Sequence, residues 1–125
     1  VGGEPNGKKV AALGLSYKPN VDDVRESPAV DVVKLLEAEG AIVKPFEPFK
    51  PDVVVDGVSS VASLDAALLD VDVILFQVAH HQFRELTPTK LDTMTDAKLI
   101  VDAVRVTMSD EWRSSNYKIF DLGVG

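Results

Sequence analysis

Apolar residues in this chain fall into short runs that alternate with longer amphipathic stretches. Runs rich in valine, isoleucine and leucine between turn residues predict buried strands. Stretches with apolar residues three or four positions apart predict helices. We expect strands over residues 8–15, 41–46, 71–78, 98–102 and 117–122, a short extended piece over 53–55, helices over 28–40, 63–69, 89–94 and 110–114, and an irregular loop or helical turn over 80–85.

Two of these helices carry clear start signals. Ser27-Pro28 is typical of an N-cap followed by proline at the first helical position, and Gly40 is typical of a helix end. Ser63 can cap the second helix in the same way. Residues 1–7 are rich in glycine and proline and lack periodicity, so we expect a linker or a turn that enters the domain over residues 8–125.

Strands that alternate with helices predict βαβ units and a mostly parallel sheet. With right-handed crossovers this becomes a single α/β domain, a Rossmann-like three-layer sandwich. Ligands of such sheets bind beyond the carboxyl ends of the strands. We therefore expect a site among the loops over residues 16–27, 47–50, 79–83 and 103–107.

Composition narrows the class of protein. A chain of 125 residues with 46% hydrophobic residues fits one globular domain. No apolar run approaches the roughly 20 residues of a membrane helix, and no secretion signal is visible, so we expect a cytoplasmic domain without a membrane partner. The net charge of −7 argues against nucleic acid as a partner. With no cysteine, the chain has no disulfide, thiolate metal site or cysteine nucleophile.

The loop after the first strand lacks the glycines of a dinucleotide-binding fingerprint. Gly14 stands alone, and Ser-Tyr-Lys over residues 16–18 follows where two more glycines are needed, so this domain is a poor candidate for binding NAD by itself. Lys18 offers a mobile charge for a phosphate or an oxyanion, or it is a solvated surface lysine. Tyr17 can stack on a base or ring, or it anchors the loop.

Arg25 lies among three acids in the same loop: Asp22, Asp23 and Glu26. One interpretation is a salt-bridge network that holds the shape of the loop, and the other is a bidentate contact to a phosphate or carboxylate. Asp22 and Asp23 also permit a metal site or a phospho-acceptor receiver domain. Receiver domains place their acids at the end of the strand itself, whereas residues 17–21 lie between the strand and Asp22 here. We therefore expect neither a receiver domain nor a metal site.

Two further strand ends carry candidate side chains. His80-His81 follows the strand expected over 71–78, but adjacent histidines of an extended segment point to opposite sides and rarely bind one metal. We expect His80 to hydrogen-bond or pack within its loop, with Phe83 anchoring that loop in the core. Arg105 follows the strand over 98–102, and it should project near the same sheet edge as Lys18, as a second cation of a cradle for a diphosphate or a sugar acid.

These segments together resemble a known family. The loop from Gly14 to Pro28 resembles the carboxy-terminal, UDP-binding domain of the UDP-glucose/GDP-mannose dehydrogenase family, in which a glycine is followed by an aromatic-lysine pair and an Arg-Glu-Ser segment. The remaining matches follow in family order: Glu39-Gly-Ala with Val43, Glu47-Pro48, the His-x-x-Phe segment within Val78–Phe83, and Asp-x-x-Arg at the end of Ile100–Arg105. The histidine and the Glu-Pro turn look most like the UDP-N-acetylmannosamine dehydrogenase branch.

The resemblance implies a place in a larger enzyme. Members oxidise the C6 alcohol of a nucleotide sugar to a carboxylate with two NAD⁺ in succession, through a cysteine-bound intermediate. An amino-terminal Rossmann domain holds NAD, and a central helical region supplies the catalytic cysteine and dimer contacts. Both are missing here, so we expect a substrate-binding domain that binds no cofactor and is inactive alone, from a parent enzyme that is a homo-oligomer.

The resemblance also implies roles for residues, none of them catalytic. Tyr17 and Lys18 would lie against the UDP-sugar, and Arg105 would reach the sugar or the diphosphate. Arg25, Glu26 and His80 would brace the loop or act on the ligand indirectly. The alternative is a free-standing nucleotide-binding or interaction module on a Rossmann-like fold.

Overall fold

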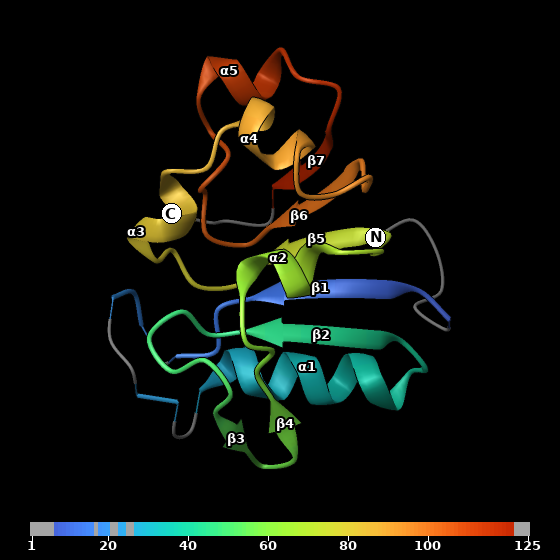
Figure 1. The fold of residues 1–125 in the computed structure, drawn as a ribbon, viewed down its shortest axis with the longest axis vertical. Coiled ribbons are helices and arrows are strands. Elements are labelled where there is room, and N and C mark those ends of the chain that lie inside the picture. The colour runs from blue at the N-terminus through green and yellow to red at the C-terminus, as the bar shows by residue number, and fades with distance from the viewer. Residues whose placement is uncertain (1–6, 17, 21–22, 25–26, 122–125) are drawn as a thin grey trace.

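Five parallel strands form one sheet in the order β2-β1-β5-β6-β7, which Figure 1 shows stacked from β2 near the bottom to β7 near the top. This computed structural model describes residues 7–16, 18–20, 23–24 and 27–121, so most of the predicted linker lies outside the described residues. The strands of the sheet are β1 (Lys9–Leu13), β2 (Ile42–Phe46), β5 (Val73–Phe76), β6 (Leu99–Asp102) and β7 (Lys118–Asp121). The predicted α/β fold with a parallel sheet is confirmed.

The helices cover the two faces of the sheet unequally. They are α1 (Pro28–Ala38), α2 (Leu64–Leu68), α3 (His81–Arg84), α4 (Pro88–Asp92) and α5 (Asp110–Arg113). The chain runs from β1 outward to β2 and then returns across β1 to β5, so right-handed crossovers put α1 on one face and the later helices on the other. The direction of winding therefore reverses between β1 and β5, the place where open sheets of this kind bind ligands.

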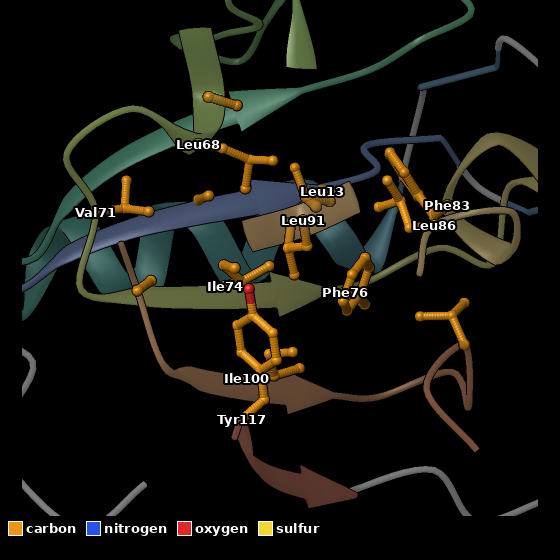
Figure 2. Close-up of a cluster of buried hydrophobic side chains, with 14 of the residues drawn as sticks. Leu13, Leu68, Val71, Ile74, Phe76, Phe83, Leu86, Leu91, Ile100 and Tyr117 are labelled. Carbon is orange, nitrogen blue, oxygen red and sulfur yellow. The ribbon is translucent and has the colours of Figure 1, made fainter. Parts of the chain in front are cut away.

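The two faces carry separate apolar cores. Alternate residues of the strands, including Leu13, Ile74 and Phe76, pack with side chains of α2 to α5, and Figure 2 shows Leu68, Phe83 and Leu91 in this cluster. On the opposite face, α1 packs against Ala12 and Leu15 through its buried valines. This alternation follows from the period of two along a strand.

The helix starts agree with the sequence. The Ser27 hydroxyl accepts a hydrogen bond from the Ala29 N–H at the start of α1, and the Ser63 hydroxyl accepts one from the Ala66 N–H at the start of α2. Satisfying these N–H groups gives each helix a defined first turn. No described helix is long and apolar enough to cross a membrane.

A small hairpin replaces the extended piece expected over residues 53–55. Its strands β3 (Val54–Val55) and β4 (Val58–Ser59) are antiparallel, and Asp56 and Gly57 between them both have positive φ, 49° and 81°. An Asp-Gly turn with two positive φ angles matches the right-handed twist of paired strands. The hairpin packs against the α1 core through Val58.

A close approach joins β1 to the loop that follows β5. Gly14 has φ 103°, and a Cβ placed there would lie 2.6 Å from the Cβ of Val78. The Gly14 N–H donates to the Phe46 carbonyl at 2.8 Å, so its backbone is also tied to the end of β2. Only glycine fits both the conformation and the space.

A buried carboxylate ties the ends of β1 and β2 together. Glu47 follows β2 directly and is 0% exposed. Its Oε1 accepts hydrogen bonds from the N–H groups of Leu15 and Ser16, both at 2.9 Å, and its Oε2 accepts one from Phe49 at 3.0 Å. Burial by itself would raise the pKa of Glu47, but the hydrogen bonds from His80, Leu15 and Phe49 outweigh it and lower the pKa.

Replacing Gly14 by alanine should destabilise the fold by about 2–4 kcal/mol, because the new methyl overlaps Val78 and the residue is strained at positive φ. Urea unfolding would measure the change. Gly57→Ala is the matched control: it has positive φ but nothing within 4 Å of the added Cβ, so it should cost only about 1 kcal/mol. Equal effects at both positions would contradict the close approach.

Replacing Glu47 by glutamine should cost about 2 kcal/mol at neutral pH, because its amide NH₂ would face the N–H of Phe49, and two donors would then meet where a carboxylate oxygen accepts a hydrogen bond. A lowered folded-state pKa means that the carboxylate contributes stability at pH values above its unfolded pKa, which is about 4.5 for a free glutamate. That contribution is lost as the pH falls through the folded value.

The difference in unfolding free energy between wild type and Glu47→Gln should therefore shrink as the pH falls below about 4.5. Urea titrations at a series of pH values would test this. The exposed Glu37 offers a control, since Glu37→Gln should change neutral-pH stability by less than about 0.5 kcal/mol. A gap for Glu47→Gln that stays constant down to acid pH would contradict the ionised, hydrogen-bonded carboxylate.

Candidate functional site

A cavity of about 210 Å³ opens at the carboxyl edge of the sheet. Ser16 and Lys18 line it from the loop after β1, Gln77 from the loop after β5, and Val104 from the loop after β6. The first turn of α1, beginning at the Ser27 cap, closes another side. The cavity therefore lies where the winding of the sheet reverses, at the end of β1 and β5.

The cavity favours a negatively charged ligand. Lys18 is the only charged side chain among the described residues that line it, and it is exposed. The amino terminus of α1, a helix of 11 residues, adds the positive end of a helix dipole. This local charge is opposite in sign to the net charge of the whole chain, −7.

His80 lies beneath the Lys18 loop and is 0% exposed. Its Nδ1 accepts a hydrogen bond from the Asn20 N–H at 2.8 Å, so Nδ1 carries no proton and the ring proton is on Nε2. Nε2 is 3.0 Å from Oε1 of Glu47 and 3.2 Å from the Ser16 hydroxyl. The Ser16 hydroxyl donates to the Lys18 carbonyl at 2.8 Å, which leaves Nε2–H to donate to the Glu47 carboxylate.

Asn20 links the first loop to the loop after β5 a second time. Its side-chain Oδ1 accepts a hydrogen bond from the His81 N–H at 2.8 Å. Its φ is 62°, in the left-handed region that asparagine tolerates better than most residues. Gln77 adds a third link, because its side-chain amide donates to the Gly14 carbonyl at 3.1 Å.

Arg105 lies in the loop after β6, next to Val104, but its side chain is not among those that line the cavity. It is exposed and has φ 60°. The buried Asp102 carboxylate builds this loop by accepting hydrogen bonds from the N–H groups of Val104, Val106 and Thr107 and from the Thr107 hydroxyl. The structure thus brings Lys18 to the cavity and Arg105 to its margin.

The other candidate side chains of the first loop lie outside the described residues. These are Tyr17, Arg25 and Glu26. Asp22, which was considered for a receiver domain or a metal site, also lies outside them. Among the described residues, no group of three or more histidine, aspartate or glutamate side chains could hold a metal ion.

Apart from His80, the residues that hold the site together are not evident as site residues in the sequence. Glu47 enters the prediction only as part of a motif, although its place at the end of a strand, between Phe46 and Pro48-Phe49, is a sign of a buried, hydrogen-bonded acid. Asn20 follows a Lys-Pro pair in a loop, a common setting for left-handed backbone. Asp102 ends a strand like many loop-capping acids, but most of its partners are main-chain N–H groups, which the sequence does not display.

Curated relatives match this chain along almost its whole length. It is 30% identical over 125 residues to a UDP-glucose 6-dehydrogenase of Rhizobium meliloti, covering 98% of this chain and 29% of the relative. It is 32% identical over 120 residues to a UDP-N-acetyl-D-mannosamine dehydrogenase of Methanocaldococcus jannaschii, covering 94% of this chain and 27% of the relative. The chain thus spans less than a third of the length of these relatives.

A solved structure agrees with the sequence relatives. A UDP-N-acetyl-mannosamine dehydrogenase from S. aureus superimposes with a TM-score of 0.72 at 33% identity, over 94% of this chain and 26% of that one. The profile described as "UDP-glucose/GDP-mannose dehydrogenase family, UDP binding domain" matches residues 11–109, which include the loops after β1, β2, β5 and β6. The chain belongs to the UDP-glucose/GDP-mannose dehydrogenase family, and it contains the UDP-binding domain of that family.

Proposed function

We propose that the cavity beside Lys18 binds the diphosphate of a UDP-sugar, in an NAD-dependent dehydrogenase that oxidises the sugar C6 alcohol to a carboxylate. The observation that carries the proposal is that Lys18 and the amino terminus of α1 line the same cavity, at the place where the winding of the sheet reverses between β1 and β5. A lysine and a helix amino terminus together are a common way to hold phosphate oxygens.

The size of the cavity supports a ligand shared with other domains. Pockets that enclose a whole small molecule usually measure about 300–1,000 Å³, whereas this one measures about 210 Å³. It suits the diphosphate and its immediate neighbours, while the sugar would face the amino-terminal NAD-binding and central helical domains of the parent enzyme. We place that enzyme in the cytoplasm and expect it to be a homo-oligomer.

The residues of this chain divide between holding ligand and holding loops. Lys18 would contact the diphosphate, Tyr17 would lie against the UDP-sugar, and Arg105 would reach the sugar or diphosphate from the cavity margin. Arg25, Glu26 and His80 would brace the loop. Such contacts orient the sugar for a reaction that takes place elsewhere, since orientation alone can supply a large part of a rate enhancement.

The residues present do not fit NAD or the covalent step. The loop after β1 has a single glycine at Gly14, and Ser16 stands where the dinucleotide fingerprint has its second. The chain has no cysteine to serve as the nucleophile. We therefore propose that this domain binds substrate, binds no cofactor and does not catalyse the oxidation alone.

Millimolar UDP added to the ¹⁵N-labelled chain should shift the amide resonances of residues that line the cavity, including Ser16, Lys18 and Gln77. Lys18→Ala should weaken binding about tenfold or more, because it removes a charge-assisted contact. The control Lys34→Ala removes an exposed lysine of α1 that does not line the cavity, and it should leave the affinity unchanged. Uridine without phosphate should bind more weakly than UDP. If UDP shifted none of the amide resonances of the cavity residues, the proposal would be wrong.

A further inference from the structure

The Lys18 segment is exposed, yet hydrogen bonds to buried groups hold it on both sides. Lys18, Pro19 and Asn20 are all exposed, so little packing fixes their conformation. The Ser16 hydroxyl holds the Lys18 carbonyl, and His80 Nδ1 holds the Asn20 N–H. The residue that reaches the cavity therefore sits between two anchors that both belong to one buried cluster, which we call the His80 cluster: Ser16, Glu47 and His80.

The ring of His80 is itself held in one orientation. Its Nε2 faces Glu47 and Ser16, so a ring flip would lose both contacts together with the Asn20 bond. The rings of Phe49 and Phe83 lie on it at centroid distances of 4.9 and 5.7 Å. Only the tautomer with a bare Nδ1 satisfies both neighbours, because the Asn20 N–H needs an acceptor at Nδ1 and the Glu47 carboxylate needs a donor at Nε2.

We propose that His80 is a positioning residue for ligand binding, which holds Lys18 over the cavity by accepting the Asn20 N–H at Nδ1. The inference rests on the proposed function, and it assigns His80 a specific partner and atom. A flexible lysine loses rotamer and backbone freedom when it binds a phosphate. Because the His80 cluster has already ordered residues 18–20, binding loses less of this freedom and is correspondingly tighter.

The two ring nitrogens can be tested separately with two substitutions of similar polarity. In His80→Asn the side-chain oxygen can occupy the place of Nδ1 and accept the Asn20 N–H. In His80→Gln the amide reaches toward Glu47 instead and leaves the Asn20 N–H without its partner. Both variants remove the ring and its contacts with Phe49 and Phe83, so a general effect on packing would appear in both.

We expect His80→Gln to weaken UDP binding about tenfold relative to wild type. We expect His80→Asn to retain most of the wild-type affinity. In a Lys18→Ala background, His80→Gln should have little further effect, because the lysine that it positions is gone. Calorimetric or NMR titration with UDP measures the affinities of the wild type, the three single variants and the double variant, and urea unfolding checks that each variant is folded. Equal losses in the two His80 variants, or additive effects with Lys18→Ala, would overturn the inference.

A measurement on the wild-type chain needs no substitution. The ¹⁵N shifts of the His80 ring should show a protonated Nε2 and a bare Nδ1, and a scalar coupling should connect Nδ1 to the Asn20 amide. A proton on Nδ1 would overturn the inference. Wild-type protein that does not respond to UDP would overturn the proposed function as well, whereas a normal response with unchanged affinity in His80→Gln would overturn the role of His80 alone.

Discussion

The Glu47 carboxylate is the contact on which the geometry of the site depends. It is fully buried, and its charge is compensated by main-chain N–H groups and by a histidine Nε2–H. The N–H groups of Leu15 and Ser16 lie just beyond the end of β1, where the sheet ladder no longer supplies acceptors. Buried donors of this kind need a partner, and Glu47 provides one from the neighbouring strand end. The first loop consequently leaves β1 in a direction set by β2.

The same arrangement recurs at Asp102, a buried acid at the end of β6, whose carboxylate accepts hydrogen bonds from N–H groups of its own loop. Two negative charges therefore lie under the loops that surround a cavity suited to an anion. They do not oppose an anion strongly, because each is already surrounded by N–H dipoles that point at it. The positive groups, Lys18 and the amino terminus of α1, remain on the cavity side. The buried carboxylates therefore shape the loops from the protein side, and the positive groups face the cavity.

The order of elements was predictable because it follows from local patterns. The valine-rich strands, the Ser-Pro start of α1 and the absence of a dinucleotide fingerprint are all visible along the chain. The contacts of His80 with Asn20 and Glu47 were not predictable, since these pairs lie 60 and 33 residues apart and are defined by which strands become neighbours. The β3–β4 hairpin was missed although its Asp-Gly turn was visible, because two-residue strands leave almost no periodic signal.

Arg105 illustrates a tension between folding and binding. A left-handed backbone conformation disfavours an arginine by about 1–2 kcal/mol relative to glycine, and Arg105 adopts it, at φ 60°, within the loop that the Asp102 carboxylate hydrogen-bonds. Engineering that ranked substitutions by thermal stability alone would favour glycine at position 105 and would discard a cation that directly follows Val104, a residue that lines the cavity. Since Arg105 is one of the residues that we propose to reach the ligand, screens for stable variants of this domain need a binding readout alongside the melting temperature.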